Sequence, residues 1–251
     1  NSSAASDVYK RQGKGGGGKD TLDMTPGLFR KIRLVDLGLM DYGACLDLQR
    51  RLHRKRALGG EGDTLLVVEH PTPVFTLGRN ADRNNLFLSQ DAMERRGIRC
   101  FEVERGGDVT YHGPGQLVVY AILGMEKDEN VLPLVHTLEE VMIRILEGLG
   151  LEGTRDPRNR GAWVDRQKVG FVGLAVLRGV SIHGMALNVD PDMDFFAAMN
   201  PCGMPDVEVT SIARLLQRPV GMEEVKSLLP KALQETFGPG VIMAPGDSRH
   251  P

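Results

Sequence analysis

The 251-residue chain has little cysteine and none of the spacings that usually hold a metal. Its three cysteines, Cys45, Cys100 and Cys202, form no CxxC pair, and its six histidines form no HxH or HxxxH pair. The sequence therefore predicts no metal site. An odd number of cysteines in a chain of this size, with no secretory signal before them, favours free thiols in a reducing, cytoplasmic setting.

Three further absences narrow the function. No run approaches the ~18 apolar residues that span a bilayer, so no membrane association is expected. The formal net charge of −2 does not indicate nucleic-acid binding. The stretch GKGGGGK at 13–19 resembles a P-loop, but Asp20 stands where the magnesium-binding Ser or Thr belongs, and no strand precedes it. We expect a flexible linker there and no nucleotide cofactor.

The rest of the composition is that of a globular protein. Hydrophobic residues make up 41 % of the chain and charged residues 25 %, enough apolar material for a core. Residues 1–29 are predicted to be a disordered or non-native N-terminal extension, with Met24 as a plausible true start. Residues 30–238 are predicted to form one catalytic domain, and residues 239–251 a loose C-terminal tail.

Apolar periodicity within the predicted domain indicates more strands than helices. Strands are expected at 31–37, 63–69, 74–77, 98–103, 117–123, 161–165, 167–177 and 180–189, and helices at 41–58, 90–96, 131–149 and 222 to about 237. Pro230 is a possible interruption of the last helix. Because strands and helices do not alternate strictly, the predicted class is α+β, a mixed sheet with flanking helices.

The stretch from Lys168 to Gly203 contains a residue pair suited to acyl transfer. Cys202 lies in an Asn-Pro-Cys-Gly turn, which favours an accessible thiol. A thiol is a strong nucleophile when ionised, and a nearby ammonium such as that of Lys168 favours the thiolate. Residue type alone leaves ordinary alternatives open, a small buried hydrophobe for the cysteine and a solvated surface charge for the lysine.

The second unusual stretch, RGGDVTYHGPGQ at 105–116, holds four glycines in twelve residues. Paired glycines let main-chain amides approach a ligand carbonyl or phosphate closely. The stretch lacks the GxGxxG spacing of a Rossmann loop. An ordinary glycine turn accounts for the same residues, so both interpretations stay open on this pattern alone.

Taken in chain order, five sequence features together resemble the lipoyl (octanoyl) transferase family of lipoate biosynthesis. They are RGG-x-VTYHGPGQ at 105–116, Lys168, S-x-HG-x-ALNV at 181–189, NPCG at 200–203 and Thr210-Ser211. The resemblance runs from about Ile32 to Phe237. It implies the biotin/lipoate protein ligase-like (cofactor transferase) fold. It also implies transfer of an octanoyl group from octanoyl-acyl carrier protein to one lysine of the lipoyl domains of 2-oxoacid dehydrogenases or of the glycine-cleavage H protein.

The same resemblance assigns residue roles. Cys202 would carry the acyl thioester, and Lys168 would lower the pKa of that thiol and act as acid and base. The residues that would line the acyl and pantetheine channel and complete the acyl pocket are Arg105, Gly106, Gly107, Asp108, Val109, Thr110, Tyr111, His112, Phe171, Val172, Gly173, Gly184, Met185 and Ala186. Phe171 stands where the family usually has a small residue and Met185 where leucine is common, so both are expected to affect acyl length.

Two other functions fit parts of the pattern. An ATP-dependent lipoate or biotin ligase of the same fold would activate a free acid as an adenylate and would need no cysteine nucleophile. A non-catalytic acyl-carrier binding protein would bind the carrier without a covalent adduct. Exchange of one thioester for another is close to thermoneutral, so the transferase that the resemblance implies needs no cofactor.

Overall fold

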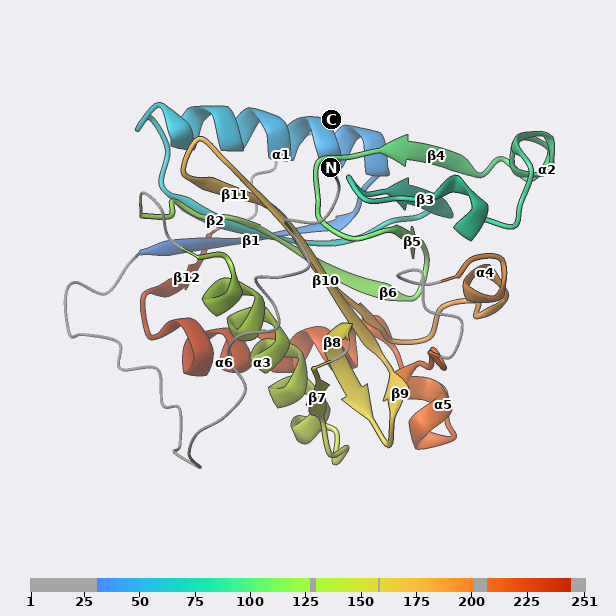
Figure 1. The fold of residues 1–251 in the computed structure, drawn as a ribbon. Helices are drawn as coiled ribbons and strands as arrows, with labels where there is room; N and C mark the ends of the chain where they lie inside the picture. Colours follow the sequence, from blue (N-terminus) through green and yellow to red (C-terminus); the bar gives the residue numbers. More distant parts are fainter. Residues whose placement is uncertain (1–30, 127–129, 158, 201–206, 245–251) are drawn as a thin grey trace, which may run out of the picture.

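The computed structural model describes residues 31–126, 130–157, 159–200 and 207–244. The predicted N-terminal extension and Cys202 lie outside these ranges. A six-stranded sheet forms the centre of the fold (Figure 1), with the strand order β10-β11-β6-β2-β1-β12. Its strands are β1 (Ile32–Leu39), β2 (Asp63–Glu69), β6 (Gln116–Ile122), β10 (Gly170–Leu177), β11 (Val180–Asn188) and β12 (Val241–Met243).

The sheet is mixed, as predicted. Strand β1 runs parallel to both β2 and β12, whereas β2, β6, β11 and β10 pair antiparallel. Successive side chains of a strand point to opposite faces, and β2 shows this directly. Leu65 and Val67 join one hydrophobic cluster, and Leu66 and Val68 join another on the other face.

Helices cover both faces of the sheet. Helix α1 (Tyr42–Ala57) packs on the face that carries Leu66 and Val68, through Cys45, Leu48 and Leu52. Helices α3 (Leu132–Gly148) and α6 (Met222–Phe237) cover the opposite face, where Figure 1 shows them below the sheet. The buried residues of α3 recur at helical spacing and form one apolar side of the helix. This apolar side packs against the sheet.

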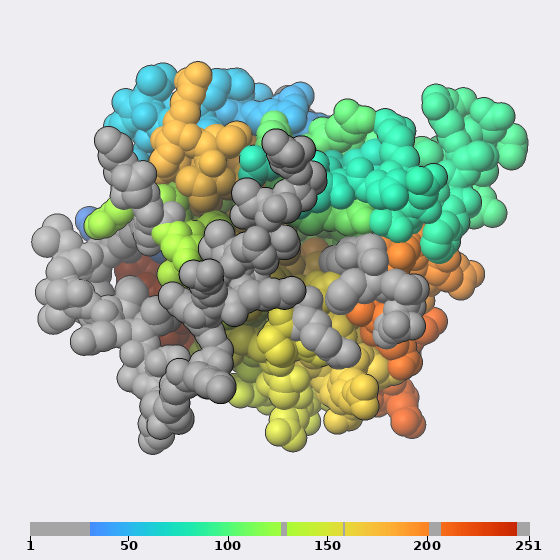
Figure 2. Space-filling view, viewed as in Figure 1, coloured from blue at the N-terminus to red at the C-terminus, as the bar shows by residue number. Residues whose placement is uncertain are grey.

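Two small sheets complete the framework of the site. The first has the order β4-β3-β5, with β3 (Val74–Leu77), β4 (Arg99–Glu102) and β5 (Val109–His112). The second has the order β7-β8-β9, with β7 (Thr154–Asp156), β8 (Asn159–Val164) and β9 (Gln167–Lys168). Short helices are η2 (Arg83–Asn85), α2 (Gln90–Arg95), α4 (Asp194–Ala197) and α5 (Ile212–Leu216). Figure 2 shows the segment that carries α2 projecting at the edge of the molecule.

Most of the predicted elements are confirmed, and the differences have local causes. The predicted N-cap Ser89 accepts a hydrogen bond from the Ala92 amide. Pro230 does not interrupt α6, because Val225, Leu229 and Leu233 bury one side of that helix on both sides of the proline. The short elements β7, α4 and α5 were not predicted, since their few residues show no readable period.

The prediction of a loose tail is wrong for part of residues 239–251. Val241–Met243 form β12, whose residues pair in register with Ile32, Arg33 and Leu34 of β1. Val241 is buried against the sheet while Ile242 and Met243 are exposed. A three-residue edge strand depends on a partner about 200 positions away, which local sequence does not reveal. Among the described residues, no helix is both long and apolar enough to cross a membrane.

Candidate active site

A pocket lies between the main sheet and the glycine-rich stretch that leads into β5. Thirteen of the fourteen predicted binding residues line it, and so does Lys168. The full lining consists of Tyr42, Arg105, Gly106, Gly107, Asp108, Val109, Thr110, His112, Val118, Tyr120, Lys168, Phe171, Val172, Gly173, His183, Gly184, Met185 and Ala186.

Tyr111 is the exception among the predicted lining residues. It is fully buried, and its ring stacks on that of Phe195 with the centroids 4.8 Å apart and the planes 9° apart. Its neighbours Thr110 and His112 line the pocket. Because adjacent side chains of a strand face opposite ways, Tyr111 supports β5 from behind instead of touching a ligand.

Glycines let the backbone segments around the pocket approach one another. A Cβ on Gly184 would lie 2.0 Å from the Val119 carbonyl oxygen, and one on Gly173 would lie 3.0 Å from Cδ of Arg105. Gly106 donates its N–H to the Leu174 carbonyl, which ties the glycine-rich stretch to β10. The ordinary-turn interpretation of this stretch is therefore incomplete, since the stretch continues into β5 and forms one wall of the pocket.

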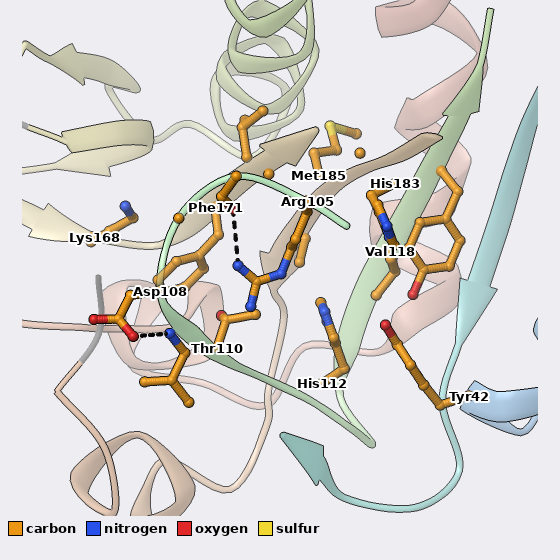
Figure 3. A pocket seen from close by; sticks show the side chains of 18 residues that line it. Tyr42, Arg105, Asp108, Thr110, His112, Val118, Lys168, Phe171, His183 and Met185 are labelled. Atoms are coloured by element: carbon orange, nitrogen blue, oxygen red, sulfur yellow. Dashed lines mark hydrogen bonds between the residues drawn. The ribbon is translucent and has the colours of Figure 1, made fainter. Parts of the chain in front are cut away.

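The guanidinium of Arg105 anchors that wall. Its Nη2 donates to the Thr76 carbonyl oxygen (2.7 Å) and to Thr76 Oγ1 (2.8 Å), so the loop is tied to β3. The side chain is buried and lies centrally among the labelled pocket residues (Figure 3). A buried guanidinium needs such acceptors, because an unsatisfied charge in this position would be costly.

Lys168 is fully buried, so the surface-charge alternative for it is wrong. Its Nζ donates to Asn159 Oδ1 (2.5 Å) and to the Arg160 carbonyl oxygen (2.7 Å). The same nitrogen lies 4.7 Å from the ring centroid of Phe171 and 5.4 Å from that of Trp163. Carbonyl oxygens and aromatic faces both favour the charged ammonium and offset its desolvation.

The main chain of Lys168 joins β9 to the segment that follows residues 201–206. Its N–H donates to the Glu208 carbonyl (2.8 Å), and its carbonyl accepts from the Thr210 amide (2.9 Å). Before residues 201–206, Asn200 donates its N–H to the Asn85 carbonyl. Cys202 itself lies outside the described residues, and its distance to Lys168 stays a prediction.

The end of the pocket away from Lys168 is polar. Tyr42, His112 and His183 lie there (Figure 3), and the rings of Tyr42 and His112 stack with their centroids 5.7 Å apart. His70 supports this end, with its Nε2 2.9 Å from the Tyr120 hydroxyl and its Nδ1 2.8 Å from the Met40 carbonyl. That carbonyl can only accept, so Nδ1 of His70 donates and Nε2 accepts from Tyr120.

Burial keeps these histidines neutral near pH 7. Desolvation lowers the pKa of His112 to about 3 and that of His70 to about 4. Desolvation also lowers the pKa of His183, against the opposing effect of Glu104, which lies 3.2 Å from its Nε2. The hydrogen bond from His183 is the largest cause that lowers the pKa of Glu104 to about 2, and Arg50 adds to it. Because their low pKa values mean that His112 and His70 bind a proton weakly, they are poorly suited to act as general bases and serve to shape and support the pocket.

Four lining residues, Tyr42, Val118, Tyr120 and His183, were not among the predicted binding residues. His183 has a φ of +67° in the middle of β11, a strained conformation of the kind that clusters at functional sites. The sequence offered only a weak signal for the other three, because a buried Tyr or Val in a helix or strand equally indicates core.

Comparisons with known proteins agree with this geometry. The family model described as the lipoyl protein ligase A/B catalytic domain matches residues 41–234. The chain therefore belongs to that family. Among solved structures, a bipartite lipoate protein ligase from Thermoplasma acidophilum superposes with a TM-score of 0.64 at 18 % identity, with 86 % of each chain covered. A lipoate-protein ligase A bound with ATP gives 0.63 at 18 % identity, with 86 % of this chain and 88 % of that chain covered.

These structural similarities confirm the predicted fold. Relatives with higher sequence identity identify the activity. An octanoyltransferase from Syntrophobacter fumaroxidans is 44 % identical over 211 residues, covering 84 % of this chain and 92 % of the relative. One from Alkaliphilus metalliredigens is 43 % identical over 213 residues, covering 84 % and 97 %. Within the family, octanoyl transfer is the activity of this enzyme.

Proposed function

We propose that the enzyme takes its octanoyl group from octanoyl-acyl carrier protein and holds it as a thioester on Cys202. It then passes the group to one lysine of a lipoyl domain or of the glycine-cleavage H protein. The observation that carries this proposal is the fully buried Lys168, whose ammonium lies in the pocket wall with two oxygen acceptors. Such a group suits a proton-transfer role beside a thiolate and has little purpose in a simple carrier-binding cleft.

In the first half-reaction, the Cys202 thiolate attacks the carbonyl carbon of the octanoyl thioester. The new carbon–sulfur bond forms on Cys202, the old one breaks, and the pantetheine thiolate leaves. The Lys168 ammonium supplies the proton that this thiolate takes up. Main-chain amides are the expected donors to the tetrahedral oxyanion, and those of Cys202 and Gly203 are the candidates.

In the second half-reaction, the neutral amine of the acceptor lysine attacks the Cys202 thioester. An amide bond forms, the Cys202 thiolate leaves, and the now neutral Lys168 takes the proton that the amine loses. Thiolate and ammonium are thereby restored. No nucleotide enters the cycle, and the covalent intermediate separates the encounters with two protein partners. The cytoplasmic location predicted from the cysteine pattern remains a prediction.

The decisive experiment is incubation with octanoyl-acyl carrier protein followed by intact-mass spectrometry. We expect one added octanoyl group, mapped to Cys202 by peptide analysis. Cys202→Ala should remove the adduct. Cys100→Ser is the matched control, because Cys100 is an exposed free thiol whose pKa is raised mainly by desolvation. The proposal fails if no adduct forms, or if Cys202→Ala still carries it.

The same protein distinguishes the ATP-dependent alternative. A ligase would join free octanoate to a lipoyl domain when ATP is added, and Cys202→Ser would leave that reaction intact. We expect no product from free octanoate and ATP, and none from Cys202→Ser with any donor. Product in either arm would favour the ligase over the transferase.

Acyl length provides a further test, because Phe171 and Met185 lie at different places in the pocket. The Phe171 ring faces the Lys168 ammonium, whereas Met185 is buried against the main apolar core. Met185→Ala removes apolar volume and should improve kcat/KM for decanoyl over octanoyl carrier by about fourfold per added methylene. The sequence led us to expect an effect of Phe171 on acyl length as well, but its ring lies against the Lys168 ammonium, so Phe171→Leu should lower the rate for all acyl lengths alike. Measuring kcat/KM across carriers of six to twelve carbons checks both, and a length shift in Phe171→Leu would contradict this assignment.

A further inference from the structure

Helix α3 places a buried carboxylate beside the site that the proposed chemistry does not use. The side chain of Glu139 is only 1 % exposed. Its Oε1 accepts a hydrogen bond from the Gly161 amide of β8 (2.9 Å). Its Oε2 lies 3.0 Å from His136 Nδ1 and 3.3 Å from Arg155 Nε. Burying an acidic group costs free energy unless its partners are specific, so these contacts call for an explanation.

The contact with Gly161 leads directly to Lys168. The Gly161 N–H and the Arg160 carbonyl belong to one peptide unit, and that carbonyl accepts from Lys168 Nζ (2.7 Å). The N–H and C=O of a trans peptide point in opposite directions. Glu139 and Lys168 therefore hold opposite edges of the same peptide plane. A carboxylate on the N–H side also polarises the amide and makes its oxygen a stronger acceptor.

Other contacts fix the surroundings of this plane. Asn159, two residues before Gly161, supplies the second acceptor for the ammonium. Gly161 packs so closely on β10 that a Cβ there would lie 2.0 Å from the Gly170 carbonyl oxygen and 3.1 Å from Cε of Lys168. Rotation of the Arg160–Gly161 peptide would move the carbonyl that accepts from the ammonium, and the hydrogen bond from the Gly161 amide to Glu139 opposes that rotation.

We propose that Glu139 is a positioning residue for acyl transfer, which acts through the Arg160–Gly161 peptide to hold the Lys168 ammonium in place. This inference rests on the proposed role of Lys168. Glu140 offers a matched comparison on the same helix. It contacts Arg155 (2.6 Å) and Arg144 (3.1 Å) but makes no hydrogen bond to β8 among the described residues. If the ion pair with Arg155 were the contact on which acyl transfer depends, replacing either glutamate would have a similar effect on the rate.

The test compares Glu139→Leu, Glu139→Gln and Glu140→Gln in the full-length protein. Glu139→Leu should lower the single-turnover acylation rate on the order of tenfold to a hundredfold, with the KM for octanoyl carrier little changed. It should also move the pH profile of Cys202 alkylation by iodoacetamide to higher pH, because a displaced ammonium favours the thiolate less. Glu139→Gln keeps an oxygen acceptor for Gly161 and should recover most of the rate and the profile. Glu140→Gln should behave as wild type.

Each outcome decides between the possibilities. If Glu139→Leu matches Glu140→Gln in rate and alkylation profile, the inference is overturned. If Glu139→Leu does not fold, Glu139→Asp replaces it, since aspartate keeps the charge but is one methylene too short for Gly161. A wild-type rate and profile in folded Glu139→Asp would then overturn the inference. Absence of a Cys202 adduct in the wild-type enzyme would instead be a failure of the proposed function.

Discussion

Replacing Lys168 by methionine is expected to lower octanoyl transfer by about 10²- to 10⁴-fold, the usual contribution of a positioned acid or base. Methionine keeps most of the volume and the apolar stem but removes the ammonium that lies in the pocket wall. Asn159 Oδ1 and the Arg160 carbonyl then lose their donor, which should destabilise the fold by about 1–3 kcal/mol. Single-turnover transfer from octanoyl carrier to a lipoyl domain, with thermal unfolding of the same sample, measures both effects.

The matched control is Lys226→Met on α6. The Lys226 side chain is 11 % exposed and pairs with Asp36 (3.1 Å), so it is a partly buried, paired lysine that does not line the pocket. We expect this variant to keep wild-type turnover with a small loss of stability.

Transfer at the wild-type rate in the Lys168→Met variant would refute the role of Lys168 as acid and base. A melted circular-dichroism spectrum would show that Lys168 acts as a structural residue.

Gly161→Ala should be among the most disruptive single methyl additions in this protein. Gly161 has a φ of +139°, and the new Cβ would lie 2.0 Å from the Gly170 carbonyl oxygen. Backbone oxygen cannot give way as a flexible side chain can, so β8 and β10 must separate. We expect a loss of at least about 3 kcal/mol in the free energy of unfolding. Transfer activity should also fall sharply, since the same methyl group would lie 3.1 Å from Cε of Lys168.

Gly179→Ala separates the cost of an unfavourable backbone conformation from the cost of a steric clash. Gly179 lies in the turn between β10 and β11 with a φ of +70°, but its nearest atom to an added Cβ is the Met125 carbonyl oxygen at 3.6 Å. Only the left-handed conformation is unfavourable there, at about 1–2 kcal/mol. Chemical denaturation of the two variants measures the difference. Equal losses in both would mean that the close approach of β8 to β10 is relaxed at little cost.

Much of the fold follows from local pattern. The continuous apolar run from Leu65 to Val68 predicts a strand, and the helical spacing of apolar residues from Leu134 to Ile145 predicts a helix, because both signals are carried by neighbouring residues. The strands at 63–69 and 74–77 are confirmed to the residue. The N-cap predicted at Ser89 is also confirmed, because its hydroxyl accepts the Ala92 amide at the start of α2.

The candidate site was predicted through ordered motifs, and residues of three of these motifs lie around one pocket. The glycine-rich stretch, the residues after Lys168 and those after His183 line one cavity. Tyr111 does not line the pocket, because the motif gives residue identity and not the side on which β5 presents each side chain. Tyr42 and Tyr120 were not predicted as pocket residues, because nothing in their local sequence distinguishes a pocket wall from a core.

Local sequence predicts most of the elements and the α+β class, since propensity, periodicity and turn chemistry act over a few neighbouring residues, and the set of motifs that belong together follows from the family resemblance. The burial of Lys168, and the hydrogen bond to Glu139 on the opposite edge of the peptide that holds its ammonium, become visible only in the folded chain. The same holds for the pairing of Val241–Met243 with β1. Burial, strand pairing and hydrogen bonds between distant segments are properties of the packed chain, and no window of local sequence contains them.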